Sequence, residues 1–246
     1  MRYKITLSYN GADFCGWQVQ PASPSVQGTL EQALSTLLKV KTGVVGAGRT
    51  DTGVNAIGYV AHFDAAEGLD CKLICYKLNA ILPSSVSVSD IVPVDAGFHA
   101  RFSATGRKYT YFLHRVKDPF AEKWSYFYGY PRLDVEAMNR AVQSILGTHD
   151  FSCFEKTGSD NKTSICTVRE AGWEKYRSEG GEYLKFTISA DRFLRNMVRA
   201  IVGTLLEVGR GKRSPESVAD LIESRDRCSA GESVPGYALF LTGIEY

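Results

Sequence analysis

Alternating and helical patterns of hydrophobic residues predict the elements in the first part of the chain. Apolar and polar residues alternate over 2–9, as in a half-buried strand, and apolar residues recur at helical spacing over 26–38 behind Ser25, a common helix cap. The remaining elements predicted here are short strands at 43–47 and 58–64, a helix at 69–82 that Pro83 ends, and a strand at 86–94. The predicted order is therefore β-α-β-β-α-β.

The rest of the chain repeats this order. The predicted elements are a strand at 107–116, a helix at 135–146, strands at 163–176 and 183–189, helices at 193–208 and 215–224, and a strand at 238–246. Asp134 and Gly147 are typical residues for the start and the end of the helix between them. The order alone predicts an α+β fold of two tandem ferredoxin-like units, at 1–104 and 105–246.

Composition narrows the cellular context without indicating a function. The 246 residues are 44% hydrophobic with a net charge of +2, and the pI is near 8.1, so any RNA-binding surface must be a local patch. Six cysteines are scattered, and the first strand begins without an apolar signal region, which predicts a reduced, cytoplasmic protein. Cys71 and Cys75 lie one helical turn apart, but no second pair of metal ligands follows. No apolar run is long enough to span a membrane.

A glycine-rich turn carries the strongest candidate for chemistry. Arg49 and Asp51 lie two residues apart in Ala47-Gly48-Arg49-Thr50-Asp51-Thr52-Gly53-Val54. Residues with this spacing on an extended segment point to one side, so the two groups can reach a common point. An adjacent cation keeps a carboxylate ionised, which suits a nucleophile better than a general acid. The turn is therefore a candidate active site.

Three other interpretations of this turn compete. Residues 43–50 fit a phosphate-binding loop with arginine in place of lysine, but a strand rather than a long helix is predicted to follow. Asp51-Thr52-Gly53 spells the tripeptide of aspartic proteases, which need a second such carboxylate, and the chain has no second copy. A surface turn held by a weak Asp–Arg pair explains the residues equally well on composition alone.

Longer blocks elsewhere decide between these interpretations. They are YKITLSYN at 3–10, GADFCGWQ at 11–18, SVQGTLE at 25–31, FHARFSA at 98–104, RKYTY at 107–111, MVR at 197–199 and IVGTLLEVG at 201–209. Together with the turn, these blocks resemble the bacterial tRNA pseudouridine synthase A family, and the resemblance runs in order to the carboxyl end.

The resemblance implies a role for individual residues. It makes Asp51 the catalytic nucleophile and Arg49 its ion-pair partner, and Tyr109 the residue that stacks on the target base and takes the C5 proton. Leu239 corresponds to an apolar residue that lines the pocket. The sequence departs from the family pattern at Asn55, Tyr59, Asn196 and Ala200, which puts details of the tRNA contacts in doubt and leaves the reaction intact.

The resemblance also implies a reaction and an architecture. Uridine at positions 38, 39 and 40 of the tRNA anticodon stem-loop is isomerised to pseudouridine by a homodimer, without a cofactor or a metal. Asp51 attacks C1′ or C6, or assists a glycal route, and the sequence does not choose among these. The sheets of the two units are expected to join into one mixed core, with the cleft between them.

Basic residues supply candidate phosphate contacts. Arg192, Arg195 and Arg199 recur at spacings of three and four along the predicted helix at 193–208, with Lys212 and Arg213 beyond it. A solvated charged face is the usual explanation for such spacing, and the resemblance favours a phosphate track. A second predicted patch consists of residues that flank Tyr109, namely Arg101, Arg107 and Lys108.

Two other classes of function remain as alternatives. A catalytically silent RNA-binding protein would keep the basic patches but would not need Asp51, Arg49 and Tyr109 together. A single-aspartate hydrolase would need a metal-binding cluster or a second carboxylate, for which Asp13 and Asp64 are the nearest candidates.

Overall fold

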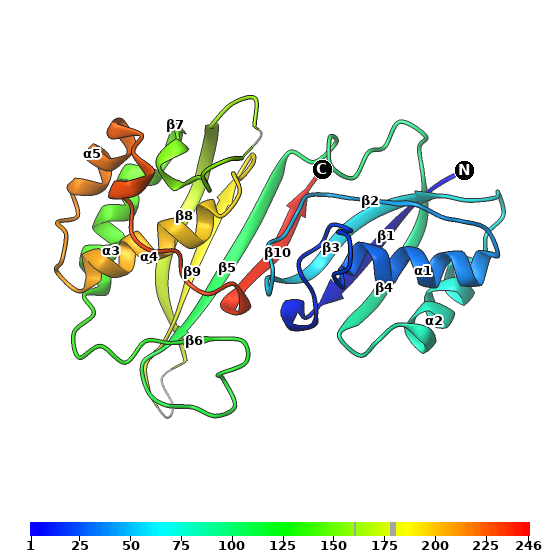
Figure 1. Cartoon of the computed structure of the whole chain (residues 1–246), viewed down its shortest axis with the longest axis horizontal. Coiled ribbons are helices and arrows are strands. Elements are labelled where there is room, and N and C mark those ends of the chain that lie inside the picture. Colours follow the sequence, from blue (N-terminus) through cyan, green and yellow to red (C-terminus); the bar gives the residue numbers. More distant parts are fainter. Residues whose placement is uncertain (160, 178–180) are drawn as a thin grey trace. The chain divides into compact units, whose positions relative to one another are not determined.

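The computed structural model describes residues 1–159, 161–177 and 181–246, which form two compact units (Figure 1). Unit 1 comprises Met1–Thr105 and Phe240–Tyr246, and unit 2 comprises Gly106–Leu239. The fold is a mixed α+β fold, as predicted. The description of each unit as ferredoxin-like stays a prediction.

Unit 1 is a sheet covered by two helices. Its elements are β1 (Arg2–Tyr9), α1 (Val26–Leu38), β2 (Val44–Gly46), β3 (Asn55–Asp64), α2 (Cys71–Ile81), β4 (Val86–Val94) and most of β10 (Leu239–Glu245). The strand β1 lies between β4 and β3 and is antiparallel to both. Figure 1 shows α1 running alongside these strands, and α1 packs on α2.

The strand β3 positions the candidate site because it has partners on both edges. One edge pairs with β1. On the other edge, β2 is antiparallel to β3 near Phe63, and β10 runs parallel to it where Phe240 and Leu241 meet Asn55 and Ala56. The chain between β2 and β3 is the glycine-rich turn. It is therefore anchored at both ends to the central part of the sheet.

Unit 2 is a second sheet with its own helical layer. Its elements are β5 (Gly106–His114), β6 (Tyr126–Phe127), α3 (Val135–Val142), β7 (Gly147–Asp150), β8 (Ile165–Arg177), β9 (Tyr183–Ala190), α4 (Met197–Gly209) and α5 (Ser217–Ser224). The strand order is β5-β9-β8-β7 with antiparallel neighbours, and β6 pairs with β5 in parallel. Short 3-10 helices lie at Gly11–Asp13, Gln143–Ile145, Ser152–Phe154, Arg227–Ser229 and Gly236–Ala238.

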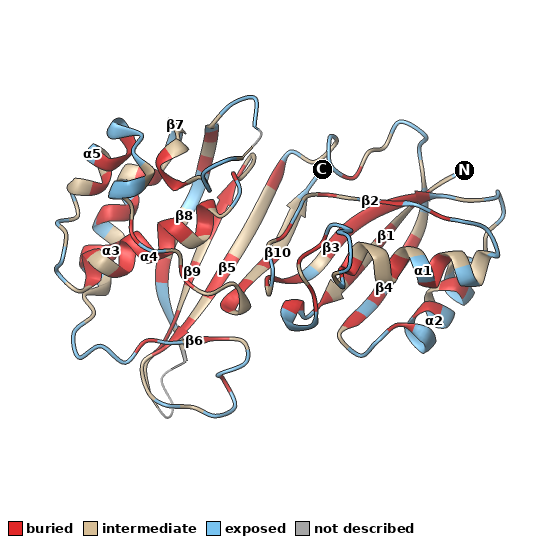
Figure 2. Cartoon of the chain, viewed as in Figure 1, coloured by how far each residue is buried: buried red, intermediate tan, exposed pale blue. Residues whose placement is uncertain are grey.

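Each unit has a core of its own. In β1 the buried and half-buried residues alternate along the whole strand, as the sequence pattern predicts. The helix α4 is buried over nearly its full length, and Figure 2 shows this as a predominantly red ribbon. No helix in the described part of the chain combines the length and the apolar character that crossing a bilayer requires.

Three features differ from the prediction. The helix predicted at 193–208 begins only at Met197, because Asn196 adopts a left-handed conformation with φ of 67° and interrupts the helical path. The strands β6 and β7 are additional. The last strand was predicted to lie in the second unit, whereas residues 240–246 cluster with unit 1 through their pairing with β3.

Candidate active site

The glycine-rich turn of residues 47–54 connects β2 to β3 in unit 1. The segment after the turn is the strand β3, as predicted, and not the long helix that a phosphate-binding loop requires. Asp51 is half-buried, Arg49 is exposed and Thr50 between them is buried. The turn thus presents its two charged side chains while its backbone is packed against the unit.

Three aromatic rings form the floor under this turn. The rings of Trp17 and Tyr59 lie 4.2 Å apart, and that of Tyr9 lies 5.6 Å from that of Tyr59. The hydroxyl of Tyr59 donates to the carbonyl oxygen of Gly48 and accepts the Gly48 N–H at 3.2 Å. All three rings are buried, so the turn rests on a rigid hydrophobic base.

Two further contacts fix the residue that precedes Asp51. The side-chain hydroxyls of Tyr9 and Thr50 are hydrogen-bonded at 2.9 Å, and the backbone N–H of Trp17 donates to the Thr50 carbonyl oxygen at 3.2 Å. On the other side, the Val54 N–H donates to the carbonyl oxygen of Asp51 at 3.1 Å. The backbone on both sides of the carboxylate is therefore held, which is what an oriented catalytic group needs.

Asn55 and Tyr59, two of the departures from the family pattern, support the turn. The Asn55 side-chain oxygen is buried and accepts the Gly11 N–H at 2.8 Å, which ties the residue after the turn to the segment that follows β1. Tyr59 bonds to Gly48 as described above. Neither supporting role could be read from the sequence, because the partner of Asn55 lies 44 residues away along the chain and that of Tyr59 lies 11 residues away.

Gly16 allows a close approach of two backbones at this site. It adopts φ of +94°, and a Cβ atom there would lie 2.4 Å from the Thr50 carbonyl oxygen. Real Cβ atoms do not come this close, so any other residue would push the turn away. A glycine is required here for space as well as for backbone conformation.

Gly16→Ala is therefore expected to lower the rate of catalysis by about ten- to a hundredfold, since small displacements of a reacting group have effects of that size. The matched control is Gly68→Ala, because Gly68 also has a positive φ, +79°, but has nothing within 4 Å of its Cβ position. Both variants should lose some thermal stability, and only Gly16→Ala should lose kcat. Equal kcat values in the two variants would show that the close approach of Gly16 to Thr50 does not position the catalytic turn.

The side chain of Arg49 is exposed, and Asp51 is half-buried and takes part in at least one interaction. The ion pair between the two side chains stays a prediction.

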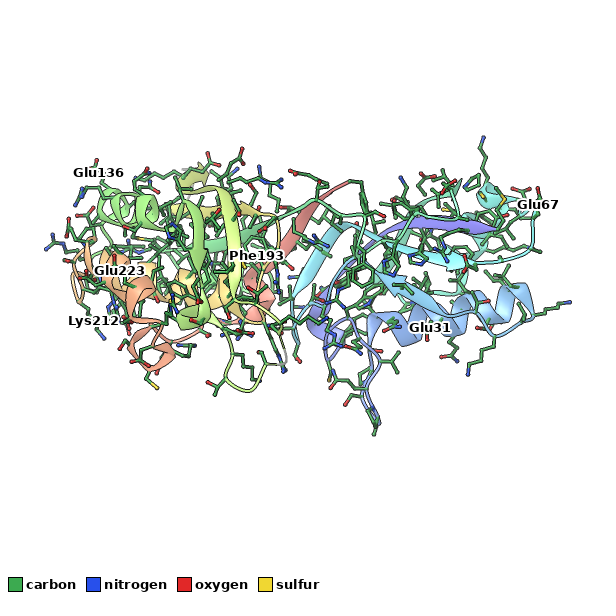
Figure 3. The ribbon with its side chains drawn as sticks, turned by 90° about the horizontal axis from the view of Figure 1, so that it is seen from above. Glu31, Glu67, Glu136, Phe193, Lys212 and Glu223 are labelled. Atoms are coloured by element: carbon green, nitrogen blue, oxygen red, sulfur yellow. The ribbon has the colours of Figure 1, made fainter. Side chains whose placement is uncertain are left out.

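Tyr109 lies on β5 in unit 2, where it pairs with Ile188 of β9. Its half-buried ring meets the ring of Phe193 edge-on, with centroids 5.2 Å apart and planes at 90°. Phe193 lies in the segment that leads into α4 and is labelled in Figure 3. A perpendicular partner of this kind helps to fix the orientation of the Tyr109 ring.

Tyr111, two residues further along the same face of β5, has a different environment. It is fully buried, and its hydroxyl has no hydrogen-bond partner among the described residues. Burial, together with the nearby phenols of Tyr237 and Tyr126, raises the pKa of Tyr111 above its usual value. Its hydroxyl therefore stays protonated at any physiological pH and is unsuited to accept a proton.

The two basic residues before Tyr109 lie on opposite faces of β5. Arg107 shares the face of Tyr109, because side chains alternate along a strand, and its guanidinium donates to the Asp191 carbonyl oxygen at 3.0 Å. Lys108 lies on the other face, where its ammonium is 3.3 Å from a carboxylate oxygen of Glu170. Arg107 and Lys108 therefore lie on opposite faces of the strand, and the tRNA contacts predicted for them stay predictions.

The arginines of the predicted phosphate track are not aligned along one helix. Because α4 begins at Met197, Arg192 and Arg195 lie in the segment before it, and only Arg199 is helical. Arg199 is half-buried, and its Nε donates to the Val234 carbonyl oxygen at 2.7 Å. Arg195 is exposed. The helical spacing that suggested the track therefore does not place these side chains in a line.

The remaining predicted residues lie in different surroundings. Leu239 is buried at the start of β10. Arg101 is exposed in the loop after β4, within unit 1, with its guanidinium 5.6 Å from the ring centre of Phe102. Among the described residues, no three His, Cys, Asp or Glu side chains gather in a group that could hold a metal ion. Cys71 and Cys75 are both free thiols.

Comparisons with known proteins identify the class. Residues 141–246 match a family described as tRNA pseudouridine synthase. Curated proteins named tRNA pseudouridine synthase A match at full length. The protein from Parabacteroides distasonis is 49% identical, over 100% of this chain and 96% of that protein. The Bacillus subtilis protein is 42% identical, over 100% of this chain and 99% of that protein.

The protein therefore belongs to the class of isomerases that form pseudouridine. More particularly, it belongs to the tRNA pseudouridine synthase A family. A solved structure of an H/ACA RNP bound to a substrate RNA aligns with 81% of this chain and 45% of that chain, at 14% identity and a TM-score of 0.31, a likeness too low to bear on fold or function.

Proposed function

We propose that this protein isomerises uridine to pseudouridine at positions 38, 39 and 40 in the anticodon stem-loop of tRNA. Membership of the tRNA pseudouridine synthase A family supports tRNA as the substrate. The anchored turn around Asp51 is the observation that carries the proposal for this chain. Its backbone is held on both sides of the carboxylate by contacts to Trp17 and Val54.

Asp51 is the proposed nucleophile. The N-glycosidic bond breaks, the uracil turns over while it remains bound, and its C5 forms the new bond to C1′. The carboxylate attacks C1′ or C6, or assists formation of a glycal. In each route it must be ionised and held in place, and Arg49 is proposed as its ion-pair partner in the RNA complex.

Tyr109 is proposed to hold the target base. A uridine in a stacked stem has to be flipped out of the helix at a cost of a few kcal/mol, which stacking and phosphate contacts offset. The half-buried ring of Tyr109, oriented edge-on by Phe193, supports a stacking role. Tyr111 is fully buried, so the half-buried Tyr109 is the better candidate of the two for reaching the C5 proton.

The resemblance to the family also supports proposals for the assembly and for the residues of the pocket. We propose a homodimer in the cytoplasm, with the sheets of the two units joined and the catalytic cleft between them. Leu239 is proposed to line the pocket. Arg101, Arg107, Lys108, Arg192, Arg195 and Arg199 are proposed tRNA contacts, of which Arg195 is exposed and Arg199 is tied to Val234.

The test of the function is a map of pseudouridine in bulk tRNA after incubation with the purified protein. The tRNA should come from cells that lack the modification at positions 38, 39 and 40. New pseudouridine at those positions is expected. New pseudouridine at other positions only would overturn the proposed specificity while leaving the reaction class intact.

Charge reversal at Arg195 tests the proposed phosphate contacts. Arg195→Glu should weaken tRNA binding and reduce the slope of log affinity against log salt by roughly 0.7–0.9, the value for one lost phosphate contact. The matched control is Lys72→Glu, which makes the same charge change at an exposed position of α2. Equal affinities and slopes for the two variants would return Arg195 to an ordinary solvated surface residue.

A further inference from the structure

Phe102 presents a large aromatic ring to solvent from a loop of unit 1. Its exposed fraction is 77%, although Phe is among the residue types most often buried. Single exposed apolar side chains are common on protein surfaces, so exposure alone does not mark a site. Phe102 differs because the loop that carries it is held in one conformation.

Hydrogen bonds within the loop fix the backbone around Phe102. The Ser103 N–H donates to the His99 carbonyl oxygen at 2.9 Å, and the His99 N–H donates to the Ser103 hydroxyl at 3.0 Å. The N–H groups of Arg101 and Phe102 both point to His99 Nδ1, each at 3.2 Å. The turn from His99 to Ser103 is therefore closed by its own polar groups.

Three other elements of unit 1 anchor the same turn from below. His62 on β3 accepts the Ala100 N–H at Nδ1, at 3.1 Å. Tyr246, which follows β10, donates its hydroxyl to the Ala100 carbonyl oxygen at 2.8 Å, and Arg2 on β1 donates to the Phe98 carbonyl oxygen at 3.0 Å. The turn is thus fastened to the sheet, and the Phe102 ring is presented from a rigid base.

The aromatic rings beneath Phe102 continue into the core. His99 stacks on the Phe102 ring with centroids 4.3 Å apart and planes at 29°, and His62 meets His99 at 4.9 Å. Burial and the nearby positive charge of Arg2 lower the pKa of His62 to about 4, so its ring is uncharged at neutral pH. Phe102 therefore stacks on His99, which in turn meets the buried His62 edge-on.

The surroundings of the ring match a nucleotide better than a protein partner. The guanidinium of Arg101 lies over the Phe102 ring, 5.6 Å from its centre. A flat aromatic face beside a guanidinium combines a stacking surface for a base with a cation for its phosphate, as in proteins that bind single-stranded RNA. Phe102 is flanked along the chain by Arg101 and Ser103, a more polar setting than the fully buried centre of a protein–protein interface.

We propose that Phe102, supported by His99 and flanked by Arg101, is a stacking platform for an unpaired base of the tRNA other than the uridine that is isomerised. The inference rests on the proposed function, because it takes tRNA as the substrate. The platform increases the affinity for tRNA and fixes the position of the tRNA on the protein, and it takes no part in the chemical step. Its removal therefore acts on binding.

The experiment compares Phe102→Ala, Phe102→Trp and Tyr76→Ala. Tyr76 is the matched control because it is an aromatic residue of unit 1 with a nearly equal exposed fraction, 74%, on the helix α2. Binding of tRNA is measured by fluorescence anisotropy over a range of salt concentrations, and KM and kcat are measured for pseudouridine formation. A tRNA with 2-aminopurine at single anticodon-loop positions reports stacking through quenching of its fluorescence.

Phe102→Ala should raise Kd and KM by about tenfold, within a range of roughly five- to 150-fold, the effect of losing one base–aromatic stack. The kcat should stay within about twofold. The slope of log affinity against log salt should not change, because stacking releases no counterions. Phe102→Trp should restore affinity, Tyr76→Ala should leave it unchanged, and quenching at one loop position should be lost only in Phe102→Ala.

Several results would overturn the proposal. These are an unchanged Kd in Phe102→Ala, an equal loss in Tyr76→Ala, or a Trp variant no better than the Ala variant. A shift of oligomeric state in Phe102→Ala, measured by light scattering, would assign the ring to a contact between subunits instead. A wild-type protein that forms no pseudouridine would refute the proposed function, whereas an active wild type with normal Phe102→Ala binding refutes only the platform.

Discussion

Asp51→Asn is expected to abolish pseudouridine formation while tRNA affinity stays within a few-fold of the wild-type value. Every route considered for the reaction needs the carboxylate, and loss of a covalent catalyst typically costs several powers of ten in rate. Affinity depends instead on phosphate contacts, which the substitution leaves in place. Single-turnover formation of pseudouridine gives the rate, and fluorescence anisotropy gives the affinity.

Two further variants make this test specific. Asp51→Glu keeps the charge but moves the carboxylate by one methylene, and we expect it to be equally inactive because the turn is held on both sides of Asp51. Asp13→Asn removes an exposed carboxylate from the same unit and should retain full activity. Residual turnover above about one per cent of wild type in either Asp51 variant would contradict a nucleophilic role.

Local signals in the sequence predicted most elements because each has a physical cause within a few residues. Ser25 was predicted to cap a helix from residue 26, and in the structure its hydroxyl accepts the Gly28 N–H at the start of α1. Asp134 likewise accepts the Ala137 N–H at the start of α3. The order of the elements in unit 1 follows the hydrophobic pattern for the same reason.

Long-range contacts were not visible in these signals. The apolar period continues through Phe193 and Leu194, so nothing in the pattern showed that Asn196 would turn left-handed and delay α4. The pairing of Phe240 with Asn55 joins residues from opposite ends of the chain, and local patterning carries no information on it. Both differences follow from tertiary structure overriding a local preference.

The candidate site likewise has some features that local sequence signals predict and others that depend on long-range contacts. The glycines and the charged residues of the turn could be read from the sequence, and so could the strand β3 that follows. The aromatic residues that support the turn could not be predicted, because Tyr9, Trp17 and Tyr59 come from β1, from the loop that follows it and from β3. The same applies to Lys108, whose position opposite Tyr109 depends on the register of β5 with β9.

Tyr109→Phe separates the two roles proposed for this residue. The ring of phenylalanine can still stack on the flipped uracil and can still meet Phe193 edge-on, so tRNA binding should be near normal. The hydroxyl that accepts the C5 proton is lost, and general base catalysis of this kind typically contributes a factor of about 10²–10⁴. Rearranged uridine that retains its C5 proton should therefore accumulate on the enzyme in place of released pseudouridine.

Tyr109→Leu provides the comparison, because it removes the aromatic face together with the hydroxyl. Its tRNA affinity should fall by about 1–3 kcal/mol relative to Tyr109→Phe, the contribution of one base–aromatic stack. Tritium release from C5-labelled uridine measures the proton transfer, and mass spectrometry of the enzyme-bound tRNA detects the intermediate. If Tyr109→Phe released tritium at the wild-type rate, another group would accept the proton, and Tyr111 is a poor substitute because its side chain is fully buried. Tyr109 would then act only as a stacking surface.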